Sequence, residues 1–146
     1  MSFRRPNPPG PGSKAKPVTS PAEYVRTVRR QEPLEALVEE TKARAWVSNA
    51  EHAVIQLGTR ERVMVRGGPD GIDFLLNADE TGVSVIIGEG AVRVRRIFFH
   101  THPRVTGPSD GDLRVLEILG QTRAYIFEIG GDSGGTLIRP KREGKR

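Results

Sequence analysis

The chain has 146 residues, 36% of them hydrophobic, with no cysteine and a formal net charge of +5. This length predicts one domain with its own hydrophobic core, and the lack of cysteine excludes disulfides and thiolate metal sites. Residues 1–20 and residues 139–146 each carry +4, which leaves −3 for residues 21–138 and argues against a domain that binds nucleic acid specifically.

The N-terminal residues 1–20 hold five of the eleven prolines and almost no large apolar residues, so we expect a disordered, basic segment. No apolar run reaches 18 residues and no secretory signal is recognisable, which predicts a cytoplasmic protein without a membrane span. We therefore expect a folded domain over residues 21–138 and a basic tail over residues 139–146.

The pair Ser20-Pro21 favours the start of a helix that carries Tyr24, Val25 and Val28. Pro33 would end that helix and begin a second one, in which Leu34, Leu37 and Val38 follow at helical spacing. Five apolar segments then predict strands: His52 to Leu57, Arg62 to Val65, Ile72 to Leu76, Val83 to Ile87, and Val92 to His102.

Glycine-rich turns are expected at residues 67–71 and 77–82. A short amphipathic helix should follow Ser109 and end at Gly120, before a last hairpin over residues 124–129 and 136–138. The hexapeptide 130–135 precedes no helix, so we interpret it as a turn rather than a phosphate loop. The order predicts an α/β fold, a mixed sheet flanked by helices.

The residues that could bind a metal ion lie at and after the end of the last of these five strands. His100 and His102 are two of only three histidines, and alternation places both on one face of the strand, with Thr101 on the other. Pro103 should end the strand. Together with Asp112 the two imidazoles form the open three-ligand sphere of a catalytic zinc. Ser109 and Asp112 also match a helix cap, which needs no metal.

These residues resemble the signature of the JAMM (JAB or MPN+) zinc metallopeptidases, a His-x-His pair followed by Ser-x-x-Asp. Six residues separate His102 from Ser109, one fewer than is usual in the family. The resemblance implies a JAB/MPN fold, similar to that of cytidine deaminases, with zinc held by His100, His102 and Asp112. It also implies that Ser109 assists catalysis by donating a hydrogen bond to the substrate.

The family also has an upstream glutamate that acts as general base, and Glu51 before an apolar strand fits that role better than Glu61, Glu80 or Glu89. We interpret its neighbour His52 as a surface or structural residue. The resemblance implies an amide-bond hydrolase acting on protein or peptide conjugates, ubiquitin-like ones included. A non-catalytic interaction module, and a toxin-array (secreted) or DNA-repair-associated JAB domain, stay open as alternatives.

Overall fold

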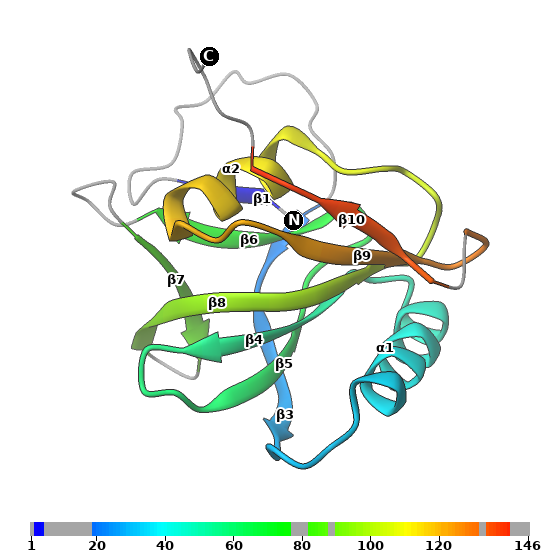
Figure 1. The fold of residues 1–146 in the computed structure, drawn as a ribbon, viewed down its shortest axis with the longest axis horizontal. Helices are drawn as coiled ribbons and strands as arrows, with labels where there is room; N and C mark the ends of the chain where they lie inside the picture. Colours follow the sequence, from blue (N-terminus) through cyan, green and yellow to red (C-terminus); the bar gives the residue numbers. More distant parts are fainter. Residues whose placement is uncertain (1, 5–18, 77–81, 88–89, 132–133, 141–146) are drawn as a thin grey trace.

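The computed structural model describes residues 2–4, 19–76, 82–87, 90–131 and 134–140. This part of the chain forms ten strands and two helices (Figure 1). In chain order these are β1 (Ser2–Arg4), β2 (Thr19–Pro21), β3 (Glu23–Val28), α1 (Leu34–Ser48), β4 (His52–Leu57), β5 (Arg62–Arg66), β6 (Gly71–Leu76), β7 (Val83–Ile87), β8 (Gly90–His102), α2 (Asp110–Leu119), β9 (Ala124–Glu128) and β10 (Thr136–Ile138).

The strands form a mixed sheet in the order β1-β6-β7-β8-β4-β5-β3. The long strand β8 connects its two parts: β7 pairs with its first residues, whereas β4 and β9 flank its C-terminal half. The β4–β8 pairing is antiparallel and the β8–β9 pairing is parallel, with β10 completing a hairpin with β9. The predicted α/β class with a mixed sheet and helices is therefore confirmed.

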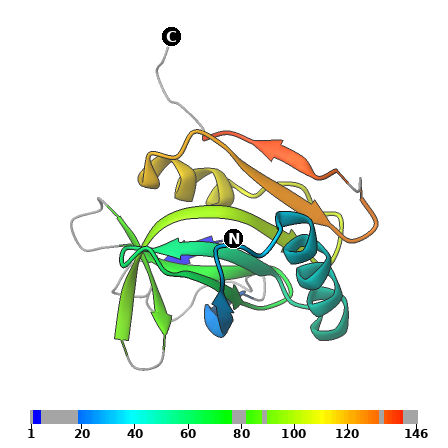
Figure 2. The ribbon, with the colours of Figure 1, turned by 60° about the horizontal axis from the view of Figure 1, so that its bottom comes forward.

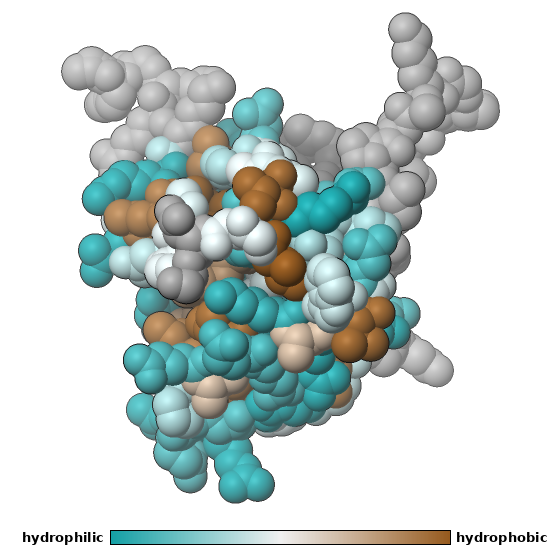
Figure 3. All heavy atoms as spheres, turned by 90° about the vertical axis from the view of Figure 1, so that its right-hand side faces the viewer, coloured by the Kyte–Doolittle hydropathy of each residue, from teal (hydrophilic) through white to brown (hydrophobic). Residues whose placement is uncertain are grey.

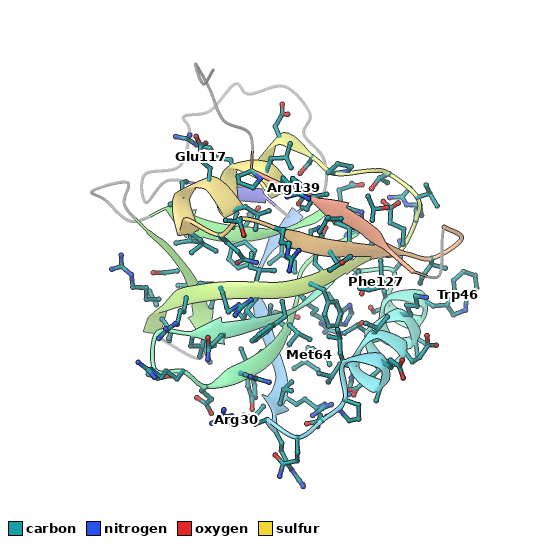
Figure 4. The ribbon with its side chains drawn as sticks, viewed as in Figure 1. Arg30, Trp46, Met64, Glu117, Phe127 and Arg139 are labelled. Carbon is teal, nitrogen blue, oxygen red and sulfur yellow. The ribbon has the colours of Figure 1, made fainter. Side chains whose placement is uncertain are left out.

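The two helices cover opposite faces of the sheet around β8 (Figure 2). Val115 of α2 belongs to the same buried cluster as Ile55 and Ile97, whereas Leu37 and Val38 of α1 belong to a second cluster that contains Phe99, Phe127 and Met64. Figure 4 shows Phe127 and Met64 on the α1 side of the sheet and Trp46, at the end of α1, pointing outwards. Each face of the C-terminal half of β8 is thus buried in its own core.

A local irregularity in β8 decides which side chains face α2. Val54 pairs with Phe99 and Ile55 pairs with Ile97, so Phe98 is an extra residue without a partner on β4. Such a bulge reverses the alternation of a strand. As a result Ile97 and His100 face α2, although an unbroken alternation would place them on opposite faces.

The predicted helix from Ser20 is wrong, because Glu23–Val28 is strand β3, paired antiparallel with β5. The segment Tyr24 to Val28 is aromatic and β-branched, a composition that fits a half-buried pleated surface better than a helix. Within residues 1–20, expected to be disordered, Ser2–Arg4 and the first residues of β2 pair with β6. The rest of that segment lies outside the described residues, as do most of the turn 77–82, residues 132–133 of the last hairpin's turn, and the end of the basic tail.

The other predicted elements are confirmed to within two residues. The helix from Pro33 is α1, the five predicted strands are β4 to β8, and the last hairpin is formed by β9 and β10. β8 ends at His102, directly before Pro103. Gly120 ends α2 in a left-handed conformation with φ of 71°, where its N–H bonds to the carbonyl of Glu117.

Candidate metal centre

Four side chains from three elements meet between β4, β8 and α2. Glu51 precedes β4, His100 and His102 end β8, and Asp112 lies in the first turn of α2. Each offers a ligand atom, and these atoms all lie within 4.8 Å of one another. All four side chains are buried, with relative exposures between 0 and 4%. The described residues therefore contain a group that could bind a metal ion.

The distances within this group are compatible with one small cation. His100 Nε2 lies 3.5 Å from Asp112 Oδ1, and His102 Nε2 lies 3.8 Å from Asp112 Oδ2. Ligands at about 2.0–2.1 Å from a tetrahedral zinc are separated by about 3.3 Å. Glu51 lies on the same side, 3.5 Å from His102 Nε2 and 4.0 Å from His100 Nε2. Contraction of a few tenths of an ångström would bring the imidazoles and Asp112 to ligand spacing.

His100 has unused binding capacity in this group. Both of its ring nitrogens are buried, and neither has a hydrogen-bond partner among the described residues. A buried polar atom without a partner costs free energy, so such atoms are rare and indicate a ligand, an ion or a water molecule. Thr101 faces the other way, as predicted, and its hydroxyl lies 3.0 Å from that of Thr41 on α1.

Asp112 both caps α2 and faces the histidines, so the two interpretations left open by the sequence, a helix cap and a metal ligand, apply together. Its Oδ2 accepts a hydrogen bond of 2.8 Å from the backbone N–H of Ser109, and Ser109 Oγ accepts one of 3.0 Å from the N–H of Asp112. This reciprocal pair is a capping box that begins α2. Ser109 is exposed at the rim of the buried group, and the cap holds the Asp112 carboxylate against the histidines.

The side chain that orients His102 is Glu128, at the end of β9. Since a carboxylate only accepts, His102 Nδ1 donates to Glu128 Oε2 at 2.9 Å, which leaves Nε2 as the lone-pair nitrogen facing Asp112. The same oxygen accepts from the backbone N–H groups of Thr106 at 3.0 Å and Gly107 at 2.7 Å. Thr106 Oγ1 also lies 3.0 Å from His102 Nδ1. Glu128 thus fixes both the imidazole and the loop after β8.

The electrostatic environment keeps these groups in the states that bind metals. Burial, reinforced by the neighbouring His100, lowers the pKa of His102, so its imidazole is neutral near pH 7. Burial alone would raise the pKa of Asp112, but its contact with His100 holds that pKa below the usual range. The pKa of Glu128 is likewise lowered despite burial, by hydrogen bonds from Thr106, His102 and Gly107. A neutral imidazole and an ionised carboxylate are the forms that bind zinc.

The structure brings together the predicted residues Glu51, His100, His102 and Asp112. Of the other glutamates considered for the base, Glu61 is exposed, and Glu80 and Glu89 lie outside the described residues. His52 is buried rather than on the surface, and its Nδ1 lies 3.0 Å from the carbonyl of Ala50.

Glu128 was not recognised from the sequence. The parallel pairing of β9 with β8 places it opposite His102, and no local pattern indicates that register.

No family model, curated protein or solved structure matches this chain. Neither α1 nor α2, the helices of the described residues, has the length and apolar character needed to cross a membrane. The fold and the buried group define a mixed α/β protein with a candidate site for a metal ion.

Proposed function

We propose that this chain is a zinc-dependent hydrolase of the JAMM type that cleaves an amide bond in protein or peptide conjugates, ubiquitin-like conjugates included. The proposal includes the JAB/MPN arrangement of the fold. Its main support is that Glu51, His100, His102 and Asp112 have ligand atoms within 4.8 Å of one another, although three were selected by their spacing in sequence and Glu51 by the family resemblance. These residues come from positions up to 61 apart in the chain, so their meeting is not a local effect.

The residues present fit a zinc ion. His100 and His102 offer imidazole nitrogens, Asp112 offers a carboxylate, and the ring nitrogens of His100 have no hydrogen-bond partner in the described part of the chain. When bound, zinc would polarise the scissile carbonyl and make water nucleophilic near neutral pH. Three protein ligands leave a coordination position for the reactants.

Glu51 would act as the general base. Its Oε1 lies 3.5 Å from His102 Nε2, so it can take up a proton beside the ligands and transfer it to the leaving amine. Ser109, exposed at the start of α2, would donate a hydrogen bond to the carbonyl oxygen of the substrate. Glu128 would hold the imidazole of His102 in the ligating orientation.

A protein-sized substrate is supported by exposed apolar side chains around the end of β8. Val105, in the loop that follows β8, is 60% exposed, and Tyr125 and Leu137 are exposed and directly paired across β9 and β10. Figure 3 views the molecule from the side of α1 and shows apolar patches among hydrophilic residues. Since the four cluster residues are at most 4% exposed, turnover requires that the residues covering them move aside.

The test compares the zinc-loaded wild type with Glu51→Gln on fluorogenic isopeptide and peptide conjugates. Glutamine keeps the size of glutamate but cannot take up the proton, so zinc content should stay the same while turnover falls about 100-fold or more. Glu61→Gln is the matched control, because Glu61 is exposed in the β4–β5 turn and should cost little. A zinc-loaded wild type that cleaves none of these conjugates would refute the proposal and leave a non-catalytic role for the same fold.

A further inference from the structure

A second site lies on the other face of β4. A groove of about 1010 Å³ runs between the C-terminal half of α1 and the N-terminal half of β3, and His52 and Arg66 line it. These two residues are directly paired across β4 and β5, so their side chains share one face. Glu51 precedes His52 by one residue and faces α2, so the groove and the metal centre lie on opposite sides of the sheet.

Two arginines line this groove, and both are held by their Nε atoms alone. Arg66 Nε donates to Glu23 on β3 at 2.9 Å, and Arg44 Nε donates to Glu40 on α1 at 2.8 Å. The four terminal nitrogens of the two guanidinium groups have no hydrogen-bond or ion-pair partner within the ranges that the structure describes. Each arginine is therefore oriented by one carboxylate and still presents two donors, the geometry that carboxylates and phosphates accept.

A buried imidazole also lines the groove. His52 is only 1% exposed, and because a carbonyl only accepts, its Nδ1 donates to the oxygen of Ala50. The neutral ring then has an acceptor at Nε2, which no described residue contacts through a hydrogen bond. A ligand that satisfies this nitrogen needs a hydroxyl or N–H donor next to its anionic group.

The remaining lining is largely apolar, with contributions from Val25, Val47 and Ile86. The volume is at the upper end of the range of about 300–1000 Å³ for sites that bind small molecules. We propose that this groove binds a small organic anion. Its phosphate or carboxylate lies between Arg44 and Arg66, a hydroxyl donates to His52 Nε2, and its apolar part packs on the three aliphatic side chains.

Hydroxy acids and phosphate monoesters of diols both have this chemistry, because each combines an anion with a neighbouring hydroxyl that keeps its proton at neutral pH. Mandelate and 2-hydroxy-2-phenylethyl phosphate are suitable probes, since they share a phenyl ring and a benzylic hydroxyl and differ in the anion. Benzyl alcohol is the uncharged control. Binding is measured by calorimetry and by the shift of the His52 imidazole signals in NMR spectra of the full chain, at probe concentrations up to about 10 mM, because ligands of this size bind weakly.

We expect at least one of the two anions to bind at one site and to shift the His52 signals, and benzyl alcohol to bind at least tenfold more weakly. Arg44→Gln and Arg66→Gln should each weaken binding of the anion at least tenfold, because each removes a charged two-donor group. Arg44→Lys retains the positive charge but not the planar guanidinium that donates two parallel hydrogen bonds, so it should also weaken binding. Arg30→Gln is the control, since Arg30 is exposed at the opposite end of β3 (Figure 4).

Binding should persist with a metal chelator present and in His102→Ala, because the groove does not include the metal centre. If 2-hydroxy-2-phenylethyl phosphate alone binds, the ligand is a phosphate monoester; if mandelate alone binds, it is a carboxylate. The proposal is overturned if neither anion binds, if folded Arg44 and Arg66 variants bind as tightly as the wild type, or if His102→Ala abolishes binding. Circular dichroism establishes that each variant is folded.

Discussion

Replacing Glu128 by glutamine should weaken zinc binding without touching a ligand. Glu128 Oε2 accepts three hydrogen bonds, from His102 Nδ1 at 2.9 Å, Thr106 N at 3.0 Å and Gly107 N at 2.7 Å. Glutamine keeps an acceptor oxygen but loses the charge, and a bond to a charged group contributes about 1 kcal/mol more than a neutral one. The hydrogen bond to Glu128 orients the His102 imidazole and makes it a stronger zinc ligand. Loss of the Glu128 charge should therefore lower zinc affinity about 10- to 100-fold.

The other two bonds hold the loop after β8, so the metal-free variant should also lose about 1–2 kcal/mol of unfolding free energy. Zinc affinity is measured by competition with a chromophoric chelator, and stability by urea unfolding of the metal-free protein. Glu117→Gln is the matched control, because the Glu117 carboxylate pairs with Arg114 on the surface of α2 and, among the described residues, with no other side chain. The reasoning fails if Glu128→Gln binds zinc as tightly as the wild type while remaining folded.

Three further predictions concern the fold and the cap. Gly135→Ala should destabilise the protein by more than about 1 kcal/mol in urea unfolding, because Gly135 has φ of +79° and an added Cβ would lie 2.7 Å from the ring of Phe127; unchanged stability would contradict the described turn. Ser109→Ala should cost about 1 kcal/mol through loss of the α2 cap, whereas Ser109→Asp should restore stability. Because an ionised aspartate only accepts hydrogen bonds, activity that also returns in Ser109→Asp would show that Ser109 acts only through the cap. Burial lowers the pKa of His52 from 6.5, so below about pH 6.5 the unfolded chain binds more protons than the folded one, and the free energy of unfolding decreases as the pH is lowered. His52→Gln should make this decrease smaller in urea unfolding between pH 5 and 7. An unaltered pH dependence would show that His52 does not contribute to it.

The sequence predicted most of the elements because their patterns are local. The alternation in β4 to β8, the spacing of Leu37 and Val38, and the cap at Ser109 each depend on a few neighbouring residues. Residues 20–32 were misassigned because Tyr24, Val25 and Val28 match a helical spacing about as well as a strand. Pairing with β5 decides between the two, and local sequence does not encode that pairing.

The sequence predicted the site residues that belong to the motif, but not the features that depend on how the strands pair. The spacing of His100, His102 and Asp112 identified three members, and the resemblance to JAMM enzymes added Glu51. The bulge at Phe98 was not predicted, although it turns His100 to the face that carries Ile97. Glu128 was missed for a related reason, since its position opposite His102 depends on the register of two parallel strands joined through α2.

Metal content is the measurement that tests the central claim most directly. The wild type, purified without chelators and analysed for elements, should contain about one zinc per chain, or take up one zinc when it is added. His102→Ala should contain none, because the two remaining ligands, His100 and Asp112, would bind the ion too weakly. A folded wild type that is free of metal and does not take up added zinc would contradict the account, even though its four side chains lie together.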